Sequence, residues 1–409
     1  MEYKSYKLKN VLMEKGYIRG PFGSALKRAE LLKQGIPVYE QKNAIYNIRT
    51  FRYFVSKEKY EKLKRFTVEP YDLVISCSGT VGKTTIISPT DPKGIISQAL
   101  LILRPDINVI NPYYLYYFFQ SKKGYNELIN RSSGSVQVNI AKRNIIENIS
   151  INLPSVSNQK KIVDFLSSLD NKVNSNQKII ANLEELSQTL FKRWFVDFEF
   201  PDENGNPYKS SGGEMVDSEL GEIPRSWKVD ELGNYIKIKS GKRPKNKVDN
   251  KDIENMVPII GASKIMGYTN DYIYNEKIII IGRVGTHGVI QRFSTKTWPS
   301  DNTFVITSDF ESIIYQLLKS IDYISLNRGS TQPLLSQKDI KNTKVAMPTN
   351  ETLLYKYQNE NDHILKMMDQ KNIENQKLAQ LRDTLLPKLM SGEIEIPDDI
   401  EVMEDELSI

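Results

Sequence analysis

Two long stretches of the chain carry apolar residues at a helical spacing. The first, residues 155–200, contains no Gly or Pro. Its apolar positions fall at heptad spacing, in steps of three, four or seven residues, at Ile162, Leu166, Leu169, Val173, Ile180, Leu183, Leu190 and Trp194. A stripe with a 3.5-residue period held over about four heptads favours a coiled coil over a globular amphipathic helix. Asn176 falls on this stripe, where it either fixes the register of a helix pair or lies at a solvated end of the interface.

The second stretch, residues 351–390, repeats this pattern near the end of the chain. Its apolar positions are Tyr357, Ile364, Met368, Leu378, Leu385 and Leu389. Lys371 occupies the stripe position that matches Asn176, and Pro387 is expected to kink or end the helix. At 1.5 Å per residue, each helix should be about 50 Å long.

Shorter apolar runs broken by Gly and Pro precede each long helix, which is typical of strands. The predicted strands include Leu73–Ile75, Thr85–Ile87, Ala99–Leu103, Lys277–Ile281, and two that end at a proline, Ile149–Leu153 and Thr343–Met347. Four glycines, Gly79, Gly82, Gly282 and Gly285, are expected to mark a tight turn between two strands. The stretch "YYLYYFF" is interpreted as a helix whose aromatic face packs on the sheet.

Three blocks of sequence occur twice, in the same order and at offsets near 200 residues. "YDLVISCSGTVGK" matches "YNEKIIIIGRVGT", "RSSGSVQVNIAKRNIIENISINLP" matches "NRGSTQPLLSQKDIKNTKVAMP", and "LEELSQTLFKRW" matches "LAQLRDTLLPKL". This period is far longer than that of a solenoid. The chain is therefore a tandem duplication of one unit, a mixed domain followed by a long helix.

The duplication predicts an α+β fold: two similar α/β domains joined by two long, antiparallel coiled-coil helices, related by a pseudo-twofold axis. The expected segments are a first domain at 1–154, a first helix at 155–197, a linker at 198–224, a second domain at 225–348, a second helix at 349–392 and a tail at 393–409. The linker is polar and rich in Gly, Ser and Pro. The stretch "GEIEIPDDIEVMEDELSI" holds eight acidic residues and is expected to be solvated, or to dock a basic partner.

Positive charge is concentrated in the two domains. Residues 1–154 have a net charge of +12 and residues 225–348 of +7, while the remaining segments together carry −13. Folded basic domains are what a polyanion-binding protein needs, although soluble lysine-rich surfaces give the same count. With one cysteine, no apolar h-region at the start and no membrane-length apolar run, the sequence predicts a reducing, cytoplasmic location and no membrane association.

Motifs that suggest catalysis lack essential parts. "SGTVGKTT" is not a phosphate-binding loop, because the position that requires a first glycine is Cys77. "NPYY" lacks the second proline of the adenine methyltransferase motif, and the glycine-rich cofactor loop of such enzymes is missing. His287 has no carboxylate arranged around it, and Asp197 and Glu199 lack the lysine of a nuclease site. The sequence therefore predicts a binding protein, with no catalytic residue, cofactor site or metal site in this chain.

The stretches where the two copies differ most are basic loops. Arg and Lys there can hold phosphates or pair with guanine, and Gln can read adenine. A solvated surface role is the alternative for each. The candidate DNA-binding residues are Arg19, Lys27, Arg28, Lys83, Arg131 and Gln137 in the first domain, and Lys242, Arg243, Lys245, Arg283, His287, Arg328 and Gln332 in the second.

With this organisation in view, the chain resembles the DNA-specificity subunits of type I restriction-modification systems. The resemblance rests on "GSVQVNIAKRNIIENISINLP" followed by "SNQKKIVDFLSSLDNKV", on "LSQTLFKRWFVDFEFP" and "LGEIPRSWKVDELGNYIKIKSGKRP", and on "LRDTLLPKLMSGEIEIP". It implies two target-recognition domains, each of which reads one half of a gapped site in double-stranded DNA. It also implies that the helices set the gap and dock two methyltransferase (modification) subunits, which use S-adenosylmethionine to methylate adenine N6, and that motor-nuclease (restriction) subunits add cleavage.

Two other interpretations remain open on the residues alone. A fused enzyme fragment would need the cofactor loop and catalytic motif that the sequence lacks. A coiled-coil protein that bridges DNA without sequence preference would bind any duplex in a strongly salt-dependent manner. The bases recognised and the gap length do not follow from the sequence, because they depend on loop geometry and DNA deformation.

Overall fold

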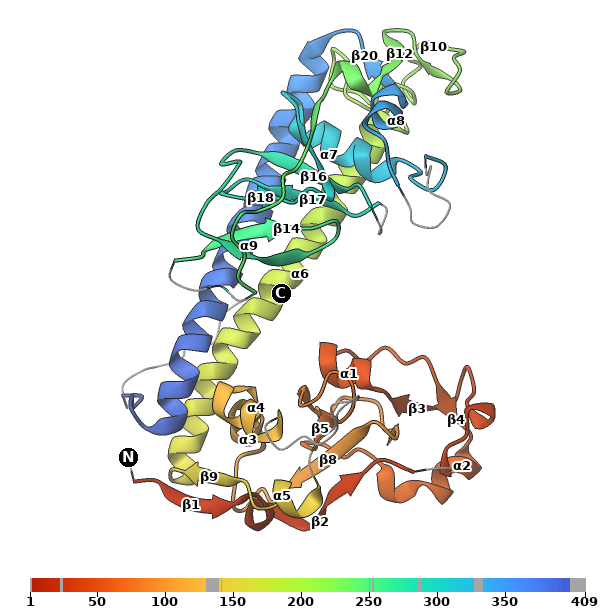
Figure 1. The fold of residues 1–409 in the computed structure, drawn as a ribbon. Helices are drawn as coiled ribbons and strands as arrows, with labels where there is room; N and C mark the ends of the chain where they lie inside the picture. The colour runs from red at the N-terminus through yellow and green to blue at the C-terminus, as the bar shows by residue number, and fades with distance from the viewer. Residues whose placement is uncertain are drawn as a thin grey trace. The chain divides into compact units, whose positions relative to one another are not determined.

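The computed structural model describes residues 2–22, 25–129, 140, 142–249, 251, 254–284, 288–326 and 334–397. It divides into two compact units: unit 1 comprises residues 1–174 and 375–409, and unit 2 comprises residues 175–374. Two long helices, α6 (Val156–Phe195) and α9 (Glu351–Ser391), contribute to both units (Figure 1). A helix with the length and apolar character needed to cross a bilayer is not found anywhere in these ranges.

Unit 1 contains three small sheets built from the N-terminal part of the chain. A four-stranded antiparallel sheet has the order β2-β8-β5-β6, a three-stranded sheet has the order β4-β3-β7, and β1 pairs with β9. In the second sheet β3 runs parallel to β7. The strands are β1 (Lys4–Lys7), β2 (Leu12–Arg19), β3 (Ile36–Tyr39), β4 (Phe54–Val55), β5 (Leu73–Ser76), β6 (Thr84–Ile86), β7 (Ile95–Ile96), β8 (Leu100–Pro105) and β9 (Ser150–Leu153).

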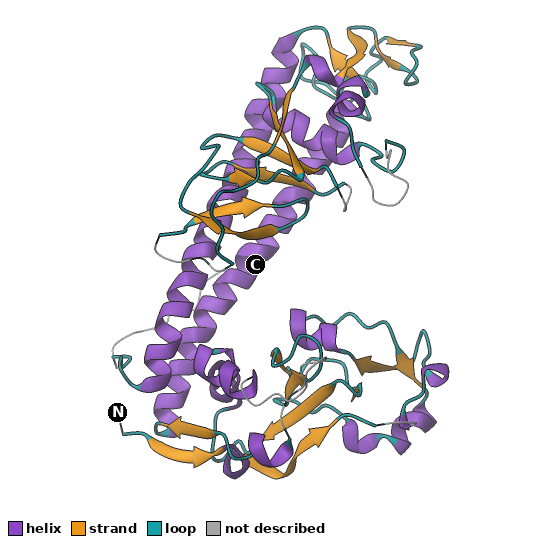
Figure 2. Cartoon of the chain, in the orientation of Figure 1, coloured by secondary structure: helices purple, strands orange, loops and turns teal. Residues whose placement is uncertain are grey.

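Short helices cover these sheets (Figure 2). They are α1 (Gln41–Tyr46), α2 (Lys57–Lys62), α3 (Pro112–Gln120), α4 (Lys122–Ile129) and α5 (Arg143–Ile146). Helix α3 is the predicted aromatic helix: it buries Tyr114, Tyr117 and Phe118 in the same core as Leu73 and Leu103 of the four-stranded sheet. Asn111 caps it, since the Asn111 side chain accepts a hydrogen bond from the Tyr113 backbone N–H (2.9 Å).

Unit 2 repeats the three sheets of unit 1. The order β13-β19-β16-β17 corresponds to β2-β8-β5-β6, β15-β14-β18 corresponds to β4-β3-β7, and β12 pairs with β20 as β1 pairs with β9. The parallel pair recurs as well, between β14 and β18. The elements are β10 (Met215–Val216), β11 (Ile223–Pro224), β12 (Trp227–Glu231), β13 (Lys237–Ser240), β14 (Val257–Ile260), β15 (Ile265–Thr269), β16 (Ile278–Gly282), β17 (Ile290–Phe293), β18 (Trp298–Pro299), β19 (Thr303–Thr307), β20 (Lys344–Pro348), α7 (Glu311–Ser320) and α8 (Gln337–Asn342). The α+β class and the internal duplication predicted from the sequence are confirmed.

The long helices pack against each other in both units. In unit 2, Tyr357 of α9 is fully buried against Phe191, Trp194 and Phe195 of α6, with ring centroids 5.0–6.4 Å apart. In unit 1, Leu386 and Leu389 at the end of α9 share a core with Ile162 and Leu166 near the start of α6. The start of each helix therefore pairs with the end of the other, as an antiparallel pair requires.

The predicted stripe positions face this packing. Asn176 is fully buried, so it does not lie at a solvated end. Lys371 is half-buried and its ammonium lies 2.9 Å from Glu374. Pro387 does not end the helix, because α9 continues through it to Ser391 and Gly392, at a φ of +78°, follows. Leu389 is 2% exposed, so the apolar stripe also continues past Pro387.

The expected polar linker is more ordered than its composition suggests. Phe198 and Phe200 are buried against Trp227, with ring centroids 5.3 and 5.5 Å away, and Phe200 stacks on Tyr208 at 4.7 Å. The strands β10 and β11 lie in the same segment. A few aromatic side chains among polar residues thus anchor the linker to the start of the second domain, and a composition average does not reveal them.

Candidate nucleic-acid interface

Backbone hydrogen bonds bring three loops of unit 1 together at one edge of the four-stranded sheet. Strand β2 ends there, and the Gly20 N–H donates to the Leu100 carbonyl oxygen (2.9 Å) at the start of β8. Strand β5 also ends there: the Cys77 N–H donates to Ala99 (2.8 Å), and the Cys77 carbonyl accepts from Ile140 (3.1 Å). The loop after β2, the turn after β5 and the connection around residue 140 therefore begin or end side by side. We call this edge of the sheet, with the three loops that meet there, the loop edge.

Unit 2 builds its loop edge with the same hydrogen bonds. The Gly241 N–H donates to Thr303 (2.9 Å), the Arg283 N–H donates to Asn302 (2.8 Å), and the Arg283 carbonyl accepts from Leu335 (3.0 Å). Each bond has a counterpart in unit 1, at Gly20, Cys77 and Ile140 respectively. We call these three backbone hydrogen bonds, with the strand ends that they join, the frame. The two copies share it even though the loops that leave it differ in sequence.

This frame corrects the sequence alignment of the two copies around the glycines. Ser76 lies opposite Leu100 in unit 1, and Gly282 lies opposite Thr303 in unit 2, so the structure matches Ser76, not Gly79, with Gly282. Gly79 and Gly82 have φ values of +64° and +81°, as the predicted turn requires. Gly282 instead ends strand β16, where a Cβ would lie 2.7 Å from the Cβ of Ala262. Gly285 lies outside the described residues.

A glycine that the sequence comparison did not single out fixes the loop edge in each unit. A Cβ on Gly20 would lie 2.1 Å from the Ser97 carbonyl oxygen, and a Cβ on Gly241 would lie 2.1 Å from the Ser300 carbonyl oxygen. Neither contact leaves room for a side chain, because the neighbouring atom belongs to the backbone. The signal in the sequence was one glycine after each corresponding strand, in "IRGP" and "KSGK".

The candidates of unit 1 that the structure describes lie on or after the strands of the loop edge. Arg19 is the last residue of β2 and is half-buried, while Lys27 and Arg28 are exposed in the loop that follows. Lys83 is exposed after the β5 turn, and its ammonium lies 5.0 Å from the ring centroid of Tyr125. Arg131 and Gln137 lie outside the described residues.

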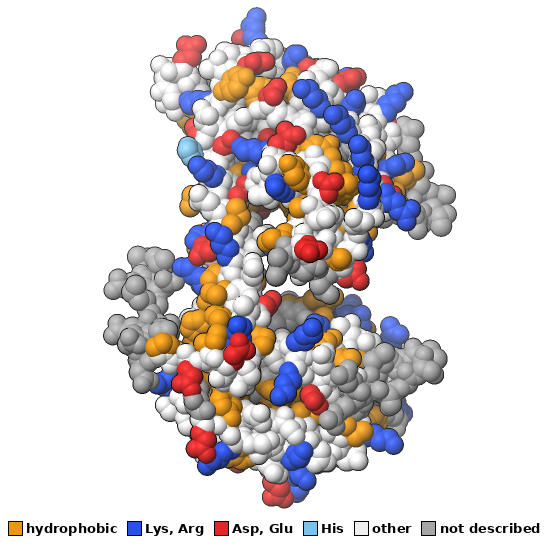
Figure 3. Space-filling view, turned by 60° about the vertical axis from the view of Figure 1, so that its left-hand side comes forward, with side chains coloured by type: hydrophobic (Ala, Val, Ile, Leu, Met, Phe, Trp, Pro, Cys, Tyr) orange, Lys and Arg blue, Asp and Glu red, His pale blue; other side chains and the backbone are white. Residues whose placement is uncertain are grey.

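The candidates of unit 2 that the structure describes gather at the corresponding place. Lys242, Arg243 and Lys245 are exposed directly after Gly241, and the Lys242 carbonyl accepts a hydrogen bond from the Trp298 indole N–H (2.8 Å). Arg283 is exposed where β16 ends. Figure 3 shows Lys and Arg side chains following one another across one face of this unit. His287, Arg328 and Gln332 lie outside the described residues.

The sequence profile described as "Type I restriction modification DNA specificity domain" matches the chain twice, at residues 15–185 and 224–383. These two segments cover most of the chain. The chain belongs to this specificity family.

Curated relatives agree with this assignment. The MjaIX specificity subunit of Methanocaldococcus jannaschii is 28% identical over 315 residues, which cover 70% of this chain and 69% of the relative. The HindI specificity subunit of Haemophilus influenzae is 24% identical over 73% of this chain and 81% of its own length. The fold is also similar to the crystal structure of a type I restriction-modification S subunit from M. genitalium, with a TM-score of 0.56 and 16% identity over 95% of this chain and 96% of that chain.

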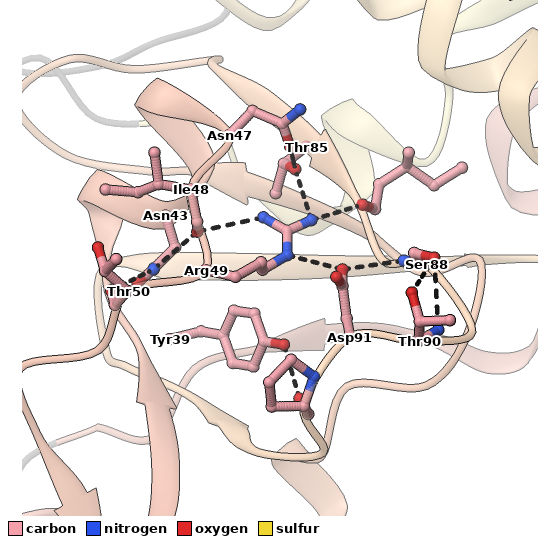
Figure 4. A network of polar contacts seen from close by, with 12 residues as sticks. Tyr39, Asn43, Asn47, Ile48, Arg49, Thr50, Thr85, Ser88, Thr90 and Asp91 are labelled. Atoms are coloured by element: carbon pink, nitrogen blue, oxygen red, sulfur yellow. Dashed lines mark hydrogen bonds and ion pairs between the residues drawn. The ribbon is translucent and has the colours of Figure 1, made fainter. Parts of the chain in front are cut away.

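The two specificity domains differ in one further element near the loop edge. In the first domain, residues 40–53 connect β3 to β4 and include α1, whereas only residues 261–264 connect β14 to β15. The Arg49 guanidinium holds this insertion in place: it lies 2.6 Å from the Asp91 carboxylate and donates to the Ile86 carbonyl oxygen (2.8 Å) and the Thr85 hydroxyl (3.1 Å) (Figure 4). The Arg49 guanidinium is thus occupied by contacts within the domain, while Tyr46 on the insertion is 71% exposed.

Sequence reasoning also missed a cavity beside Arg19 in the first specificity domain. It has a volume of about 550 Å³, and its lining includes Tyr17, Arg19, Phe22 and Arg65. The Arg65 guanidinium lies 4.4 Å from the ring centroid of Phe66. These cations and rings come from segments about 45 residues apart in the sequence, so no local sequence motif predicts the cavity.

Cys77, Asp197 and Glu199 are buried or paired within the protein. Burial raises the pKa of the Cys77 thiol to about 12, so the reactive thiolate is not formed near neutral pH. Asp197 pairs with Lys192 (2.6 Å), and Glu199 accepts hydrogen bonds from the Ser210 N–H and hydroxyl (3.1 Å each). In the described part of the chain, no three His, Cys, Asp or Glu side chains gather as a metal site would require.

The glycines of the loop edge give a direct test of the shared frame. Gly20→Ala and Gly241→Ala should each lower the free energy of unfolding by roughly 1–3 kcal/mol, because the new methyl group collides with a backbone carbonyl. Chemical denaturation of the two variants measures this loss. The exposed neighbour Ser240→Ala is the control and should change stability by less than about 0.5 kcal/mol. A wild-type denaturation midpoint for both glycine variants would contradict the frame.

Proposed function

We propose that the loop edge of each unit reads one half of a gapped, two-part site in double-stranded DNA. The observation that carries this proposal is the identical hydrogen-bond frame in both copies, from which different exposed basic side chains emerge. Two rigid frames with different loops suit the recognition of two different half-sites, since base contacts specify sequence while phosphate contacts position the protein. The candidate residues named above would supply both kinds of contact.

The long helices would set the distance between the half-sites. Two sites on the same side of B-DNA lie about one turn, or roughly 34 Å, apart. A helix the length of α6 extends roughly 60 Å at 1.5 Å per residue, which is enough to hold two domains at that separation.

The chain would act together with catalytic subunits rather than by itself. The relatives are named as specificity subunits of restriction enzymes. We infer that this chain docks two methyltransferase subunits, which bind S-adenosylmethionine and methylate adenine N6, and that motor-nuclease subunits complete the restriction enzyme in the cytoplasm. Sequence-independent bridging of DNA would not need two different sets of loops on one frame.

The basic loop of the second domain should contribute phosphate contacts. Replacing Lys242, Arg243 and Lys245 together by Ala should weaken DNA binding by the complex and reduce its dependence on salt. The slope of log K against log salt should become shallower by about 0.9 for each phosphate that the variant no longer neutralises. Binding measured across a range of salt concentrations gives this slope.

The control for this variant removes the same charge elsewhere. Lys57, Lys209 and Lys366 are exposed residues outside the loop edges, and replacing these three by Ala should leave the slope nearly unchanged. Equal effects of the two triple variants would mean that the loop edge has no special role in binding DNA.

Shortening both helices tests the role of the spacer. Deletion of seven residues from the middle of both α6 and α9 keeps the apolar stripe in phase and shortens the pair by roughly 10 Å, about the rise of three base pairs. The gap in the preferred DNA site should shorten accordingly, as measured by binding to duplexes that differ only in gap length. An unchanged preferred gap in a folded variant would rule out the spacer role.

A further inference from the structure

The second domain is joined to the long helices at one end only. Its chain enters after α6 finishes at Phe195, and it leaves where β20 ends at Pro348 and α9 begins at Glu351. The strands β12 and β20 pair at this end, where Trp227 lies opposite Pro348. Along the helices the domain is held by apolar contacts. Polar contacts hold it as well: the Gln316 side chain donates to the Ser187 hydroxyl of α6 (2.7 Å), and the Lys277 ammonium donates to the Asp362 carboxylate of α9 (3.0 Å).

A buried ion-pair cluster attaches the domain to α9 farther from this end. The Arg292 guanidinium, on β17, donates to the Asp369 carboxylate of α9 (2.6 Å). Arg292 also pairs with Glu311 in the first turn of α7, and the Ser294 hydroxyl donates to Asp369 (3.1 Å). The side chains of Arg292 and Glu311 are only 7% and 6% exposed, and that of Asp369 is 24% exposed.

Because Asp369 lies far from the junction, its contact with Arg292 restricts the orientation of the second domain relative to α9. Asp369 lies roughly 27 Å along α9 from Glu351, at 1.5 Å per residue. A rotation of only about 7° about the junction would displace the domain there by about 3.4 Å, the rise of one base pair. A rotation of this size would therefore be enough to weaken the discrimination between gaps that differ by one base pair.

The cluster resists such a rotation because its members are buried charges. If the domain rotates in this way it swings across α9, and Arg292 is separated from Asp369 while it remains shielded from water; an unpaired buried charge is strongly unfavourable. The Arg292 cluster thus adds a restraint on orientation to the contacts that lie nearer the junction.

We propose that Asp369 is a positioning residue: together with Arg292 it locks the second domain onto α9, so that the protein selects one gap length. This inference rests on the proposed function, in which the helices set the distance between two half-sites. Asp369 makes its contacts with the domain, so its effect on DNA recognition is indirect.

Unit 1 has an analogous lock built from different residues. Asp170 of α6 accepts a hydrogen bond from the Tyr117 hydroxyl of α3 (2.8 Å) and another from the Arg382 guanidinium of α9 (2.9 Å). Asp170 lies roughly 21 Å from the start of α6, at 1.5 Å per residue. In the alignment of the two helices, Asp170 and Asp369 are not at matching positions. The same geometric need is met independently in each unit.

The test compares Asp369→Asn with wild type in the complex assembled with its methyltransferase partner. Methylation rates are measured on duplexes whose gap is the preferred length, or one base pair longer or shorter. The variant should methylate the preferred site within about threefold of the wild-type rate, while the ratio of preferred to altered gaps falls by roughly fivefold or more, equivalent to about 1 kcal/mol of lost discrimination. Glu360→Gln, an exposed carboxylate on the same helix, should keep the wild-type ratio.

Each outcome of this test has a defined meaning. A folded Asp369→Asn complex with the wild-type ratio would overturn the positioning role while leaving the proposed function intact. A wild-type complex without any gap preference would overturn the proposed function and this inference with it. If Asp369→Asn fails to assemble, Ser294→Ala, which removes only the weaker bond to Asp369, takes its place and should lower the ratio in the same direction.

Discussion

The pairing of α6 with α9 is the interaction on which the rest of the structure depends. A single helix of this length cannot bury its apolar stripe, and most of the stability of such a helix comes from packing. The two helices are far apart in the sequence, and they meet through Tyr357 and the aromatic end of α6 in unit 2 and through the core shared by Leu386 and Ile162 in unit 1. Because the helices run through both units, neither domain core is complete without segments from both of them.

The two domains have the same sheets but differ in the loops that leave them. The sheets, their order and the hydrogen bonds at the loop edge are the same in both copies. Backbone bonds and the close approach at Gly20 and Gly241 fix this frame without demanding particular side chains in the loops that leave it. Loop sequences can therefore change while the points from which they emerge stay in place. A DNA specificity domain that occurs twice in one chain can in this way carry different loops on the same scaffold.

The sequence was sufficient to predict the large features of the molecule. A 3.5-residue period predicted two long helices, and the structure has a long helix over each stretch. The repeated blocks predicted two similar domains, and the specificity profile matches the chain twice. The comparison of the two copies matched Gly282 with Gly79, because both are followed by a "VG" pair. The structure matches Gly282 with Ser76 instead, since the connection from β5 to β8 is three residues longer than that from β16 to β19. Of the thirteen candidate DNA-binding residues, those that the structure describes lie on or beyond the loop edges, and their contacts with DNA stay a prediction.

Other features lay beyond the reach of the sequence for a physical reason. Arg49 and Arg292 look like other basic residues of their domains, yet Arg49 is bound to Asp91 and Arg292 to Asp369 and Glu311. A charged side chain is free or committed according to its neighbours in space, which come from distant parts of the chain. The same holds for Phe200 and Tyr208, which give an apparently polar linker an aromatic anchor.

A map of N6-methyladenine across the genome, in cells that carry the methyltransferase partner and either have or lack this chain, tests the central claim most directly. The account predicts that removing the chain abolishes methylation at a single motif made of two parts separated by a gap of fixed length. An unchanged map, with the partner expressed and bound to this chain in the unmodified cells, would contradict the claim that the chain selects the methylated sequence.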